Sequence, residues 1–543
     1  MELVTIALAT LASLSRVLAL ILVSIVSGWF LSYFAVKNRK FENIYVSFVN
    51  IFESIPVIGF LPIVLIVFIS GLGGTLGVEI AADFLVFDAI VWNIWIGQYQ
   101  AFKTIPQHLI EVSENYNFGW WGKMKSLYIP FSYPRVSSDI FPSFADALFY
   151  IMVSEVFSVG ITAYKVFGIG TLIVQATSAG DLNSIYECLG ILAIGVVVIT
   201  LAFGSFSKHA IAKYGLNTSI EIKRHIGYWR PHIRKWRTQA GPAFQFSKYT
   251  AKMKTGTENI QTAMMTKVRT SRSFEKTGKY IGTAIAWIFL IFIGYSSIYV
   301  ILSVPHSQWA VYLSQTPNLL YQMGVDYIRV IVVTIISFVF AVSLGYYLAI
   351  HKKVSNVSLP IIQTVSAFPA PAYFPLIFAA TAPFLMHNLS SIETELYVML
   401  LCFLGTFYYV FFGFWVGVRA IPTEFLEVTQ NYKIGFFTKM RRIILPATFP
   451  YLVTGLSSTI NSAWGGLAVG EFWPNIYGTQ TLQVHTGMMK VISEGLTNGN
   501  MGIAAWTSLL FAIVVGVYSI IFTRNLMDLA RKKYVIEEGI YAA

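Results

Sequence analysis

The sequence predicts an all-α, polytopic membrane protein of about eleven transmembrane helices, arranged as two parallel repeats of five core helices. Two observations lead to this fold class. The 543-residue chain is 56% hydrophobic and only 12% charged, whereas an ordinary soluble domain is about 25% charged. It therefore lacks the polar surface that a water-soluble protein of this length needs. A polar loop sequence also occurs twice, which indicates an internal duplication.

The apolar residues are gathered into runs long enough for membrane helices of about 20 residues. These runs fall near residues 3–35, 44–70, 84–102, 138–160, 186–206, 282–303, 325–350, 359–386, 394–418, 453–473 and 502–522. The first run lacks the features of a cleaved signal peptide, so we expect a retained helix. The basic clusters between runs all fall on one side of the membrane in this scheme. The positive-inside rule then predicts a multi-pass membrane protein with its N-terminus outside and its C-terminus in the cytoplasm.

One segment carries most of the net positive charge. Residues 207–279 contain 16 Lys and Arg against 3 acidic residues. Such a segment is typical of nucleic-acid binding or of a cytoplasmic loop near anionic lipid heads, and the flanking apolar runs favour the second interpretation. We therefore expect the lipid bilayer, and no nucleic acid, as a partner. The predicted divisions are a first repeat at 1–206, a basic cytoplasmic linker at 207–281, an extra helix at 282–304 and a second repeat at 305–543.

Several classes of chemistry have no support in the sequence. The two cysteines lie inside apolar runs, so no disulfide framework is expected. The histidines show no metal-binding spacing, and no G-x-x-x-x-G-K-[ST] motif for ATP is present. We expect a chain that is not an enzyme and that holds neither a metal nor a cofactor of its own.

The duplicated loop spans residues 105–134 and 421–450, with 11 identities at an offset of 316. The shared positions include Glu111, Asn115, Tyr116, Gly119 and Pro130 in the first copy, and Glu427, Asn431, Tyr432, Gly435 and Pro446 in the second. Each repeat has five core helices, and the extra helix reverses the chain once more, so the copies run parallel. This argues against a carrier built from inverted repeats, and it predicts a pseudo-twofold path between the halves.

The residue types in the loop predict its local structure. A glutamate is favoured in the first turn of a helix, so we expect Glu111 and Glu427 at helix starts. The glycine suits a sharp break between two short helices, where a β-carbon would obstruct the turn. The closing prolines are expected to end the second short helix. The loop is either a pair of amphipathic turns on the membrane surface or a knob presented twice to a twofold cytoplasmic partner.

The loops resemble the EAA loop in the inner-membrane subunits of binding-protein-dependent ABC importers. The resemblance covers Glu111 to Gly119 and Glu427 to Gly435, each followed by an apolar residue and a proline. The two alanines of the family motif are replaced by Val112-Ser113 in the first copy and by Val-Thr in the second. The wider pattern is similar to the nitrate/sulfonate/taurine branch of this family. The similarity lies in an arginine early in the first core helix, a Pro-x5-Pro motif in the second, and a Trp and a Glu late in the fourth: Arg16 and Arg329, Pro56/Pro62 and Pro369/Pro375, and Trp464 and Glu471.

The resemblance implies a type I, MetI-like fold and a permease with both halves of its pore in one chain. It also implies two copies of a P-loop ATPase subunit that bind the ATP, an extracytoplasmic substrate-binding protein, and a small anion as substrate. An ion-coupled secondary transporter with parallel repeats is the alternative, and a structural or signalling membrane protein is a third class.

Seven residues are candidates for the translocation path: Arg16, Pro56, Glu155, Arg329, Pro369, Trp464 and Glu471. Ionisable residues inside membrane helices are costly and therefore have a partner or a function. The arginines either pair with the glutamates and lock each half, or supply positive potential for an anion. The prolines are expected to kink the second helices, either as gate hinges or for packing. The acids Glu53, Asp88 and Asp146 have no acidic counterparts in the second repeat, so the path is not strictly symmetric.

Overall fold

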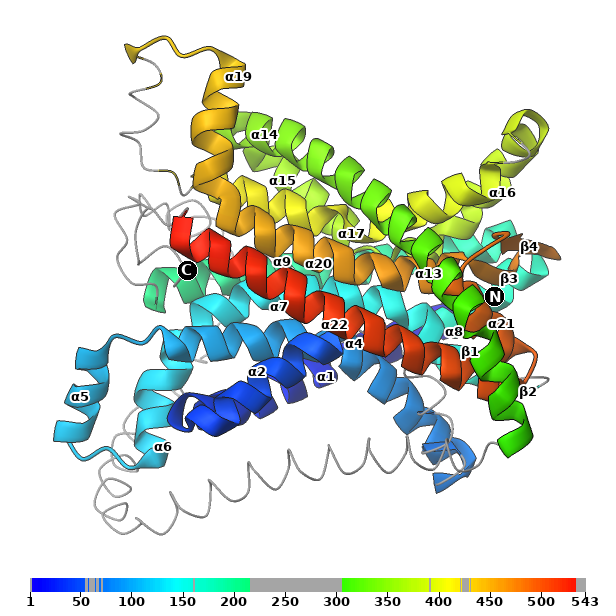
Figure 1. Cartoon of the computed structure of the whole chain (residues 1–543), viewed down its shortest axis with the longest axis horizontal. Coiled ribbons are helices and arrows are strands. Elements are labelled where there is room, and N and C mark those ends of the chain that lie inside the picture. The colour runs from blue at the N-terminus through cyan, green and yellow to red at the C-terminus, as the bar shows by residue number, and fades with distance from the viewer. Residues whose placement is uncertain are drawn as a thin grey trace, which may run out of the picture.

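The computed structural model is mostly helical, with helices running along the long axis of the molecule (Figure 1). It describes residues 2–53, 57, 64, 68–69, 72–159, 162–214, 305–389, 392–419, 421, 429 and 431–533. Pro56, Glu427, most of the predicted linker and the whole predicted extra helix lie outside the described residues.

The first half contains five long helices in the predicted order. They are α1 (Leu3–Lys37), α2 (Arg39–Glu53), α4 (Gly74–Lys103), α7 (Ile129–Glu155) and α9 (Leu182–Tyr214). The loop before α7 holds α5 (Gln107–Asn115), α6 (Trp120–Lys123) and the π-helical turn η3 (Met124–Tyr128). An antiparallel hairpin of β1 (Val156–Val159) and β2 (Thr162–Lys165) follows α7, and then the short helix α8 (Ile169–Ala179).

The second half repeats this order. Its long helices are α13 (His306–Phe340), continued by η4 (Ala341–Gly345) and α14 (Tyr346–Ile350), then α15 (Lys352–Ala367), α16 (Ala370–Leu389), α17 (Glu393–Arg419), α20 (Leu445–Gly470) and α22 (Met501–Lys533). Its loop contains α19 (Phe436–Lys439) and the π-helical turn η5 (Met440–Ile444). The equivalent hairpin and short helix are β3 (Phe472–Tyr477), β4 (Gln480–Gln483) and α21 (Met488–Thr497).

Seven helices of the described part are long and apolar enough to cross a membrane, or eight if the bent pair α15 and α16 forms one span. These two helices meet at an angle of 89°. The break falls at Phe368 and Pro369, where Phe368 has the extended backbone (φ −77°, ψ 125°) that a following proline favours. The expected bend of the second helix is therefore present at Pro369. About half of the predicted span at 44–70 and all of the predicted span at 282–303 lie outside the described residues.

The two halves run in the same direction and share one interior. Both hairpins lie at one end of the molecule, and both loops with α5, α6 and α19 lie at the other end, near the end of α22 (Figure 1). The second helix of each half packs against the last helix of the other half, α2 against α22 and α15 against α9. One buried cluster combines Leu85 and Phe149 of the first half with Phe374 and Trp464 of the second.

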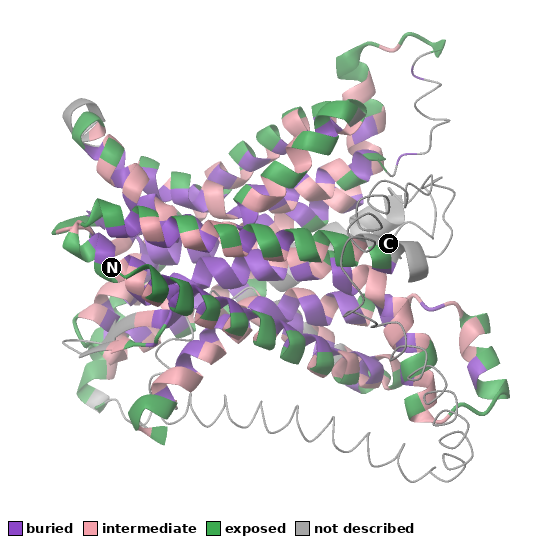
Figure 2. Cartoon of the chain, turned by 180° about the vertical axis from the view of Figure 1, so that it is seen from behind, coloured by how far each residue is buried: buried purple, intermediate pink, exposed green. Residues whose placement is uncertain are grey.

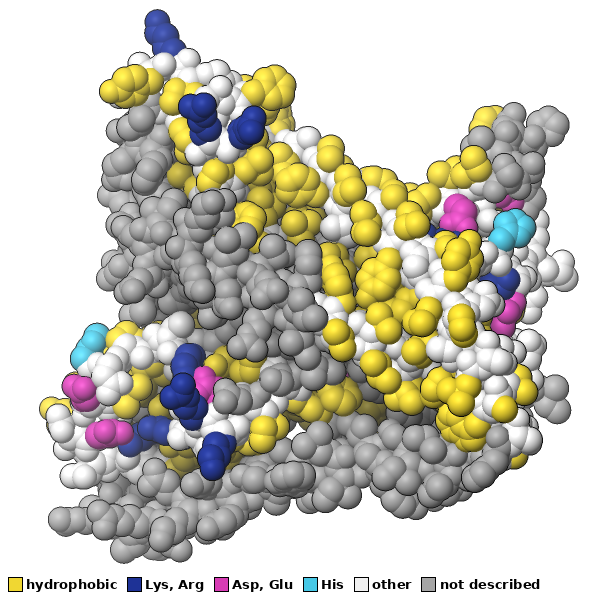
Figure 3. All heavy atoms as spheres, viewed as in Figure 1, with side chains coloured by type: hydrophobic (Ala, Val, Ile, Leu, Met, Phe, Trp, Pro, Cys, Tyr) yellow, Lys and Arg dark blue, Asp and Glu magenta, His cyan; other side chains and the backbone are white. Residues whose placement is uncertain are grey.

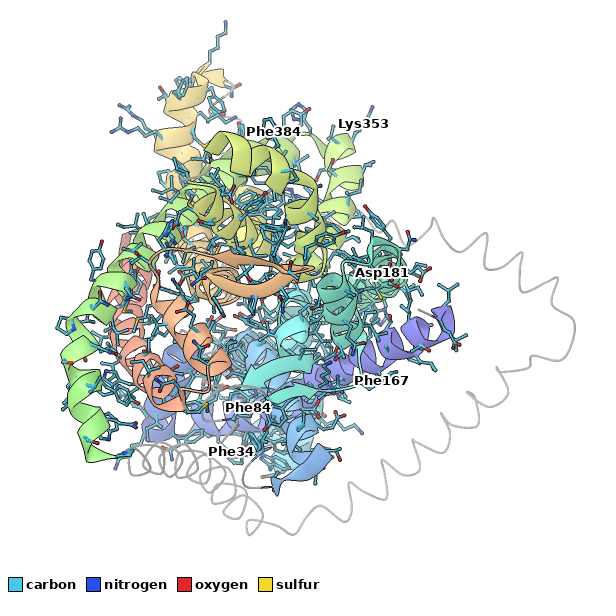
Figure 4. All side chains as sticks on the ribbon, turned by 90° about the vertical axis from the view of Figure 1, so that its right-hand side faces the viewer. Phe34, Phe84, Phe167, Asp181, Lys353 and Phe384 are labelled. Carbon is cyan, nitrogen blue, oxygen red and sulfur yellow. The ribbon has the colours of Figure 1, made fainter. Side chains whose placement is uncertain are left out.

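The hairpin end also joins the halves. Figure 4 looks onto this end, where the two hairpins lie near the centre of the molecule. The Gly478 N–H donates to the Thr177 carbonyl at 2.8 Å, and the Tyr477 hydroxyl donates to the Gly180 carbonyl at 3.2 Å. The tip of the second hairpin is thereby held to the C-terminal end of α8 in the first half.

The outer surface is apolar where a bilayer would contact it. Buried residues fill the centre, and exposed residues lie along the outward faces of the long helices (Figure 2). Large apolar side chains such as Ile194 and Ile328 are more than half exposed, at 67% and 62%. Hydrophobic side chains spread over the middle of the face in Figure 3, whereas Lys and Arg gather at the end that carries the loops. A surface of this kind fits a multi-pass membrane protein.

Small residues let α17 and α20 approach closely. A β-carbon on Gly455 would lie 2.8 Å from the Val410 Cα, and one on Gly466 would lie 2.9 Å from the Cys402 Cα. Both glycines are therefore required by a backbone contact with the neighbouring helix, as is common between membrane helices.

We predict that Gly455→Leu separates α17 from α20 and lowers the free energy of unfolding by about 1–3 kcal/mol, the usual cost of overpacking. Gly190→Leu is the matched control, because a β-carbon on Gly190 of α9 would meet no atom within 4 Å in the part of the chain that the structure describes. The measurement is thermal unfolding of the two purified variants in detergent. Equal unfolding temperatures would contradict the close packing of α17 on α20.

Candidate functional site

The first loop begins its helix earlier than expected. α5 starts at Gln107, directly after Pro106, and Glu111 is its fifth residue, so the prediction of Glu111 at a helix start is wrong. A proline immediately before a helix sets its start, because it lacks the N–H that the first turn leaves unpaired. The carboxylate of Glu111 is exposed on α5. Its counterpart Glu427 lies outside the described residues.

The turn that occurs in both loops does not require the backbone freedom of its glycine. Gly119 and Gly435 precede α6 and α19 with φ of −62° and −63°, which any residue can adopt. The left-handed residues of the turn are Asn117 and Lys433, at φ 51° and 49°. A β-carbon on Gly435 would meet no atom of the described residues within 4 Å. The expectation that a β-carbon would obstruct the turn is therefore wrong for Gly435, and the turn itself leaves space beside this residue.

The closing prolines do not end a helix. Pro130 and Pro446 are the second residues of α7 and α20, and the helix runs into them from the loop through η3 and η5. Because Pro130 has no N–H, it cannot donate the α-helical hydrogen bond to the carbonyl four residues earlier. The helix continues through this point by way of the π-helical turn, in which the Ile129 N–H donates to the Met124 carbonyl. Each loop is therefore connected to its core helix by one continuous helical rod.

Both loops expose aromatic side chains at equivalent positions. Tyr116 and Tyr432 are 74% and 76% exposed, and Trp121 and Phe437 are 53% and 84% exposed. Asn115 and Asn431 are also exposed. The loops lie at the same end of the molecule (Figure 1), so the chain presents a similar surface twice. Exposed apolar side chains of this kind mark contact with a partner or with a membrane surface.

At the hairpin end, each half contains one arginine held by three carboxylates. In the first half, the Arg16 guanidinium on α1 lies 2.7 Å from the Glu155 carboxylate at the end of α7. Its other nitrogens lie 3.0 Å from both Glu79 and Asp83 on α4. Glu155 is fully buried, whereas Glu79 and Asp83 are almost half exposed.

The second cluster is more deeply buried. Arg329 on α13 donates to Glu471 at 3.0 Å, to Asp326 at 2.8 Å and to both oxygens of Glu395 at 2.6 and 2.7 Å. Its remaining N–H donates to the Thr486 carbonyl at 2.7 Å. A guanidinium has five N–H donors, and all five are used here. Arg329 therefore has no donor left for a substrate in this conformation.

The same carboxylates also hold the helices that follow the hairpins. The Gly170 N–H donates to Glu155 at 2.7 Å, and the Lys490 N–H donates to Glu471 at 2.9 Å, so each glutamate lies at the N-terminal turn of α8 or α21. A β-carbon at Gly168 would collide with the Glu155 carboxylate, and one at Gly487 would collide with Glu471. Each cluster thus joins four elements of its own half.

This geometry favours one of the two interpretations of Arg16 and Arg329. Each arginine is paired with its glutamate and surrounded by further carboxylates, as in a lock within each half. Sequence reasoning missed five members of the clusters: Ser13, Glu79, Asp83, Asp326 and Glu395. The repeat offsets contained the signal, since 316 relates Glu79 to Glu395 and 313 relates Ser13 to Asp326.

The remaining path candidates are distributed differently. Trp464 is fully buried and packs edge-on against Tyr327 and Phe511 at ring distances of 4.8 and 4.9 Å. A cavity of about 50 Å³ lies instead between the halves, where α4 and α7 of the first half meet α17 and α20 of the second. Asp88 and Asp146, which the sequence identified as lacking acidic counterparts, both line it.

We predict that Arg329→Gln lowers the free energy of unfolding by about 3–5 kcal/mol, because it leaves buried carboxylates without their counter-charge. The loss should be smaller for Arg16→Gln, whose partners Glu79 and Asp83 are 46% and 43% exposed. Adding Glu471→Gln to Arg329→Gln should recover part of the loss. Thermal unfolding and the yield of folded protein measure these effects. An Arg329→Gln protein of normal stability that no longer transports would instead favour a direct role toward substrate.

Comparison with known proteins finds sequence similarity to transport permeases. Similarity to the nitrate import permease protein NrtB of Leptolyngbya laminosa is 23% identity over 172 residues, covering 30% of this chain and 58% of that protein. Similarity to the putative aliphatic sulfonates transport permease protein SsuC of Bacillus subtilis is 30% identity over 77 residues, covering 14% of this chain and 28% of that protein. The matched regions thus span little more than half of the first relative and about a quarter of the second.

A family model matches the chain twice, and its matches fall on the two halves. The first match covers residues 9–212 and the second covers residues 339–533, which together include most of the chain. The first match contains the first loop and the whole Arg16 cluster, and the second contains the second loop together with Glu395 and Glu471. Arg329 and Asp326 lie just before the second match. The chain belongs to the family of binding-protein-dependent transport system inner membrane components.

Proposed function

We propose that this chain is the membrane subunit of an ATP-driven importer and carries both halves of the translocation path. The observation that carries the proposal is the pair of equivalent loops at one end of the molecule, each with exposed aromatic side chains. Two copies of a P-loop ATPase subunit would dock there, one on each loop, and would bind the ATP. The chain itself would catalyse no reaction.

The two ends of the molecule are proposed to face opposite sides of the membrane and to bind different partners. An extracytoplasmic substrate-binding protein would approach the hairpin end, opposite the loops (Figure 1). The gathering of Lys and Arg at the loop end supports a cytoplasmic position for that end (Figure 3). This orientation places the N-terminus of α1 outside and the C-terminal end of α22 in the cytoplasm.

The helical rods provide the connection between the loops and the path. α7 and α20 continue from the loops into the interior, where they line the cavity between the halves. Closure of the two ATPase subunits would displace both loops and, through these rods, the walls of the cavity. Pro369, at the bend between α15 and α16, is proposed as a hinge in the same motion.

The names of the relatives, which concern nitrate and aliphatic sulfonates, support a small solute with an anionic group. Arg16 and Arg329 add little to this assignment, because carboxylates already surround both side chains. The anionic group is therefore proposed on the strength of the relatives.

We predict that Gly435→Arg abolishes docking of the ATPase subunit while leaving the fold intact. No atom of the described residues lies within 4 Å of a β-carbon on Gly435, so we expect the larger side chain to obstruct a partner rather than the fold of the chain. Co-purification of the ATPase subunit and thermal unfolding measure the two effects. The control is Asn183→Arg, an exposed residue at the hairpin end of α9. Normal docking by the Gly435 variant would refute the proposed role of the loop.

The equivalent change in the first loop should have a weaker effect. The second loop retains the Leu-Pro of the family motif at Leu445-Pro446, whereas the first has Ile129-Pro130. We therefore expect Gly119→Arg to reduce ATPase docking and transport less than Gly435→Arg, measured by the same co-purification and by solute uptake. Equal losses would show that the two loops contribute equally.

A further inference from the structure

The cavity between the halves is acidic, although it lies inside a membrane protein. Three carboxylates line it, from Glu53, Asp88 and Asp146, and none of its lining residues is Lys, Arg or His. Residues 54–71, which follow Glu53 in the chain and are only partly described, contain no basic residue in their sequence. Buried carboxylates without a counter-charge are costly, so this cavity is suited to a positive charge from outside the chain.

Asp88 is only partly satisfied by the protein itself. Its side chain is 4% exposed and accepts a hydrogen bond from the Trp92 side chain, but its Oδ2 has no hydrogen-bond partner among the described residues. Asp146 differs, because the Asn93 amide donates to it at 3.1 Å and the hydroxyls of Tyr408 and Tyr409 donate to its Oδ1. The cavity therefore combines one carboxylate fixed by donors from both halves with one buried oxygen that still lacks a donor.

The other walls suit an organic cation. Trp92, Tyr150 and Tyr409 line the cavity, and aromatic faces attract ammonium and guanidinium groups. Within the described residues, no group of three or more His, Cys, Asp or Glu side chains is placed to hold a metal ion. A volume of about 50 Å³ has room for a small polar group, since about 10–15 Å³ of such space already admits a water molecule.

We propose that this cavity binds a cationic nitrogen of the transported solute, which is therefore a zwitterion: a small molecule with an ammonium or guanidinium group as well as the anionic group indicated by the relatives. The inference rests on the proposed function, because it assigns the cavity to the translocation path. The ammonium N–H groups would donate to Asp88 Oδ2 and to Glu53, with the nitrogen over the aromatic walls. The anionic group would lie away from the carboxylates.

Three matched probes separate the charges of such a solute: 2-aminoethanesulfonate, ethanesulfonate and ethylammonium. Binding is measured by calorimetry and thermal unfolding of the purified chain, without ATPase, at constant ionic strength. We expect 2-aminoethanesulfonate and ethylammonium to bind and to raise the unfolding temperature, and ethanesulfonate to do neither. Binding of ethylammonium alone would replace the zwitterion by a simple cation. Binding of ethanesulfonate or nitrate in preference to both amines would overturn the proposal.

Two variants locate the binding in the cavity. Asp88→Asn and Asp146→Asn should each weaken the binding of 2-aminoethanesulfonate by about tenfold or more, the cost of losing a charged hydrogen bond. Without a ligand, Asp88→Asn should unfold at the same or a higher temperature, because it removes an unpaired buried charge. Glu494→Gln is the control, since Glu494 lies on α21 at the hairpin end and does not line the cavity. Unchanged amine binding in both aspartate variants would refute the site.

The experiments distinguish a failure of the cavity assignment from a failure of the proposed function. The Gly435→Arg variant should bind 2-aminoethanesulfonate as the unmodified chain does while losing the ATPase subunit. Amine binding together with unimpaired ATPase docking in that variant would refute the coupling loop and leave the cavity assignment standing. Absent amine binding together with the expected loss of docking would refute the cavity assignment alone.

Discussion

A buried arginine in a membrane protein requires nearby negative charge, and each half of this molecule is organised around that requirement. Arg16 and Arg329 join the first helix of a half to the end of its fourth core helix through Glu155 and Glu471. The same glutamates bind the N-terminal turns of α8 and α21, so the chain must return to this point after each hairpin. The position of the hairpins follows, and with it the contact between Gly478 and Thr177 that joins the halves.

The opposite end of the molecule is organised by backbone geometry rather than by charge. Left-handed residues at Asn117 and Lys433 turn the chain, and the π-helical turns η3 and η5 carry the helix past the prolines. These features lie at equivalent positions in both halves. Because the helix is not interrupted, the rigid part of each half extends from the exposed loop to the central cavity. The two ends of the molecule thus differ in kind: one is fixed by buried ion pairs, and the other extends outward as rods.

The sequence predicted the features that depend on long patterns. The order of the long helices, the parallel repeat and the bend at Pro369 follow from hydropathy, from the repeat offset and from proline chemistry. The loop was predicted less well, because Pro106 rather than Glu111 sets the start of α5. The carboxylates around each arginine were only partly predicted, because Glu79 and Glu395 approach through the packing of helices far apart in sequence. The gathering of Glu53, Asp88 and Asp146 depends on the contact between the halves, which local sequence does not encode.

Having both halves in one chain changes what the centre of the molecule can contain. In an assembly of two identical chains, every residue at the axis would lie opposite its own copy, and each acid would be doubled. Here the position equivalent to Asp146 is Ser462, and the position equivalent to Asn93 is Tyr409, and all four residues line the same cavity. Asp146 therefore does not lie opposite a second copy of itself, and the walls of the cavity differ from one side to the other. A positively charged group bound in such a centre would consequently lie nearer to the first half than to the second, a lateral preference that no pair of identical chains could impose.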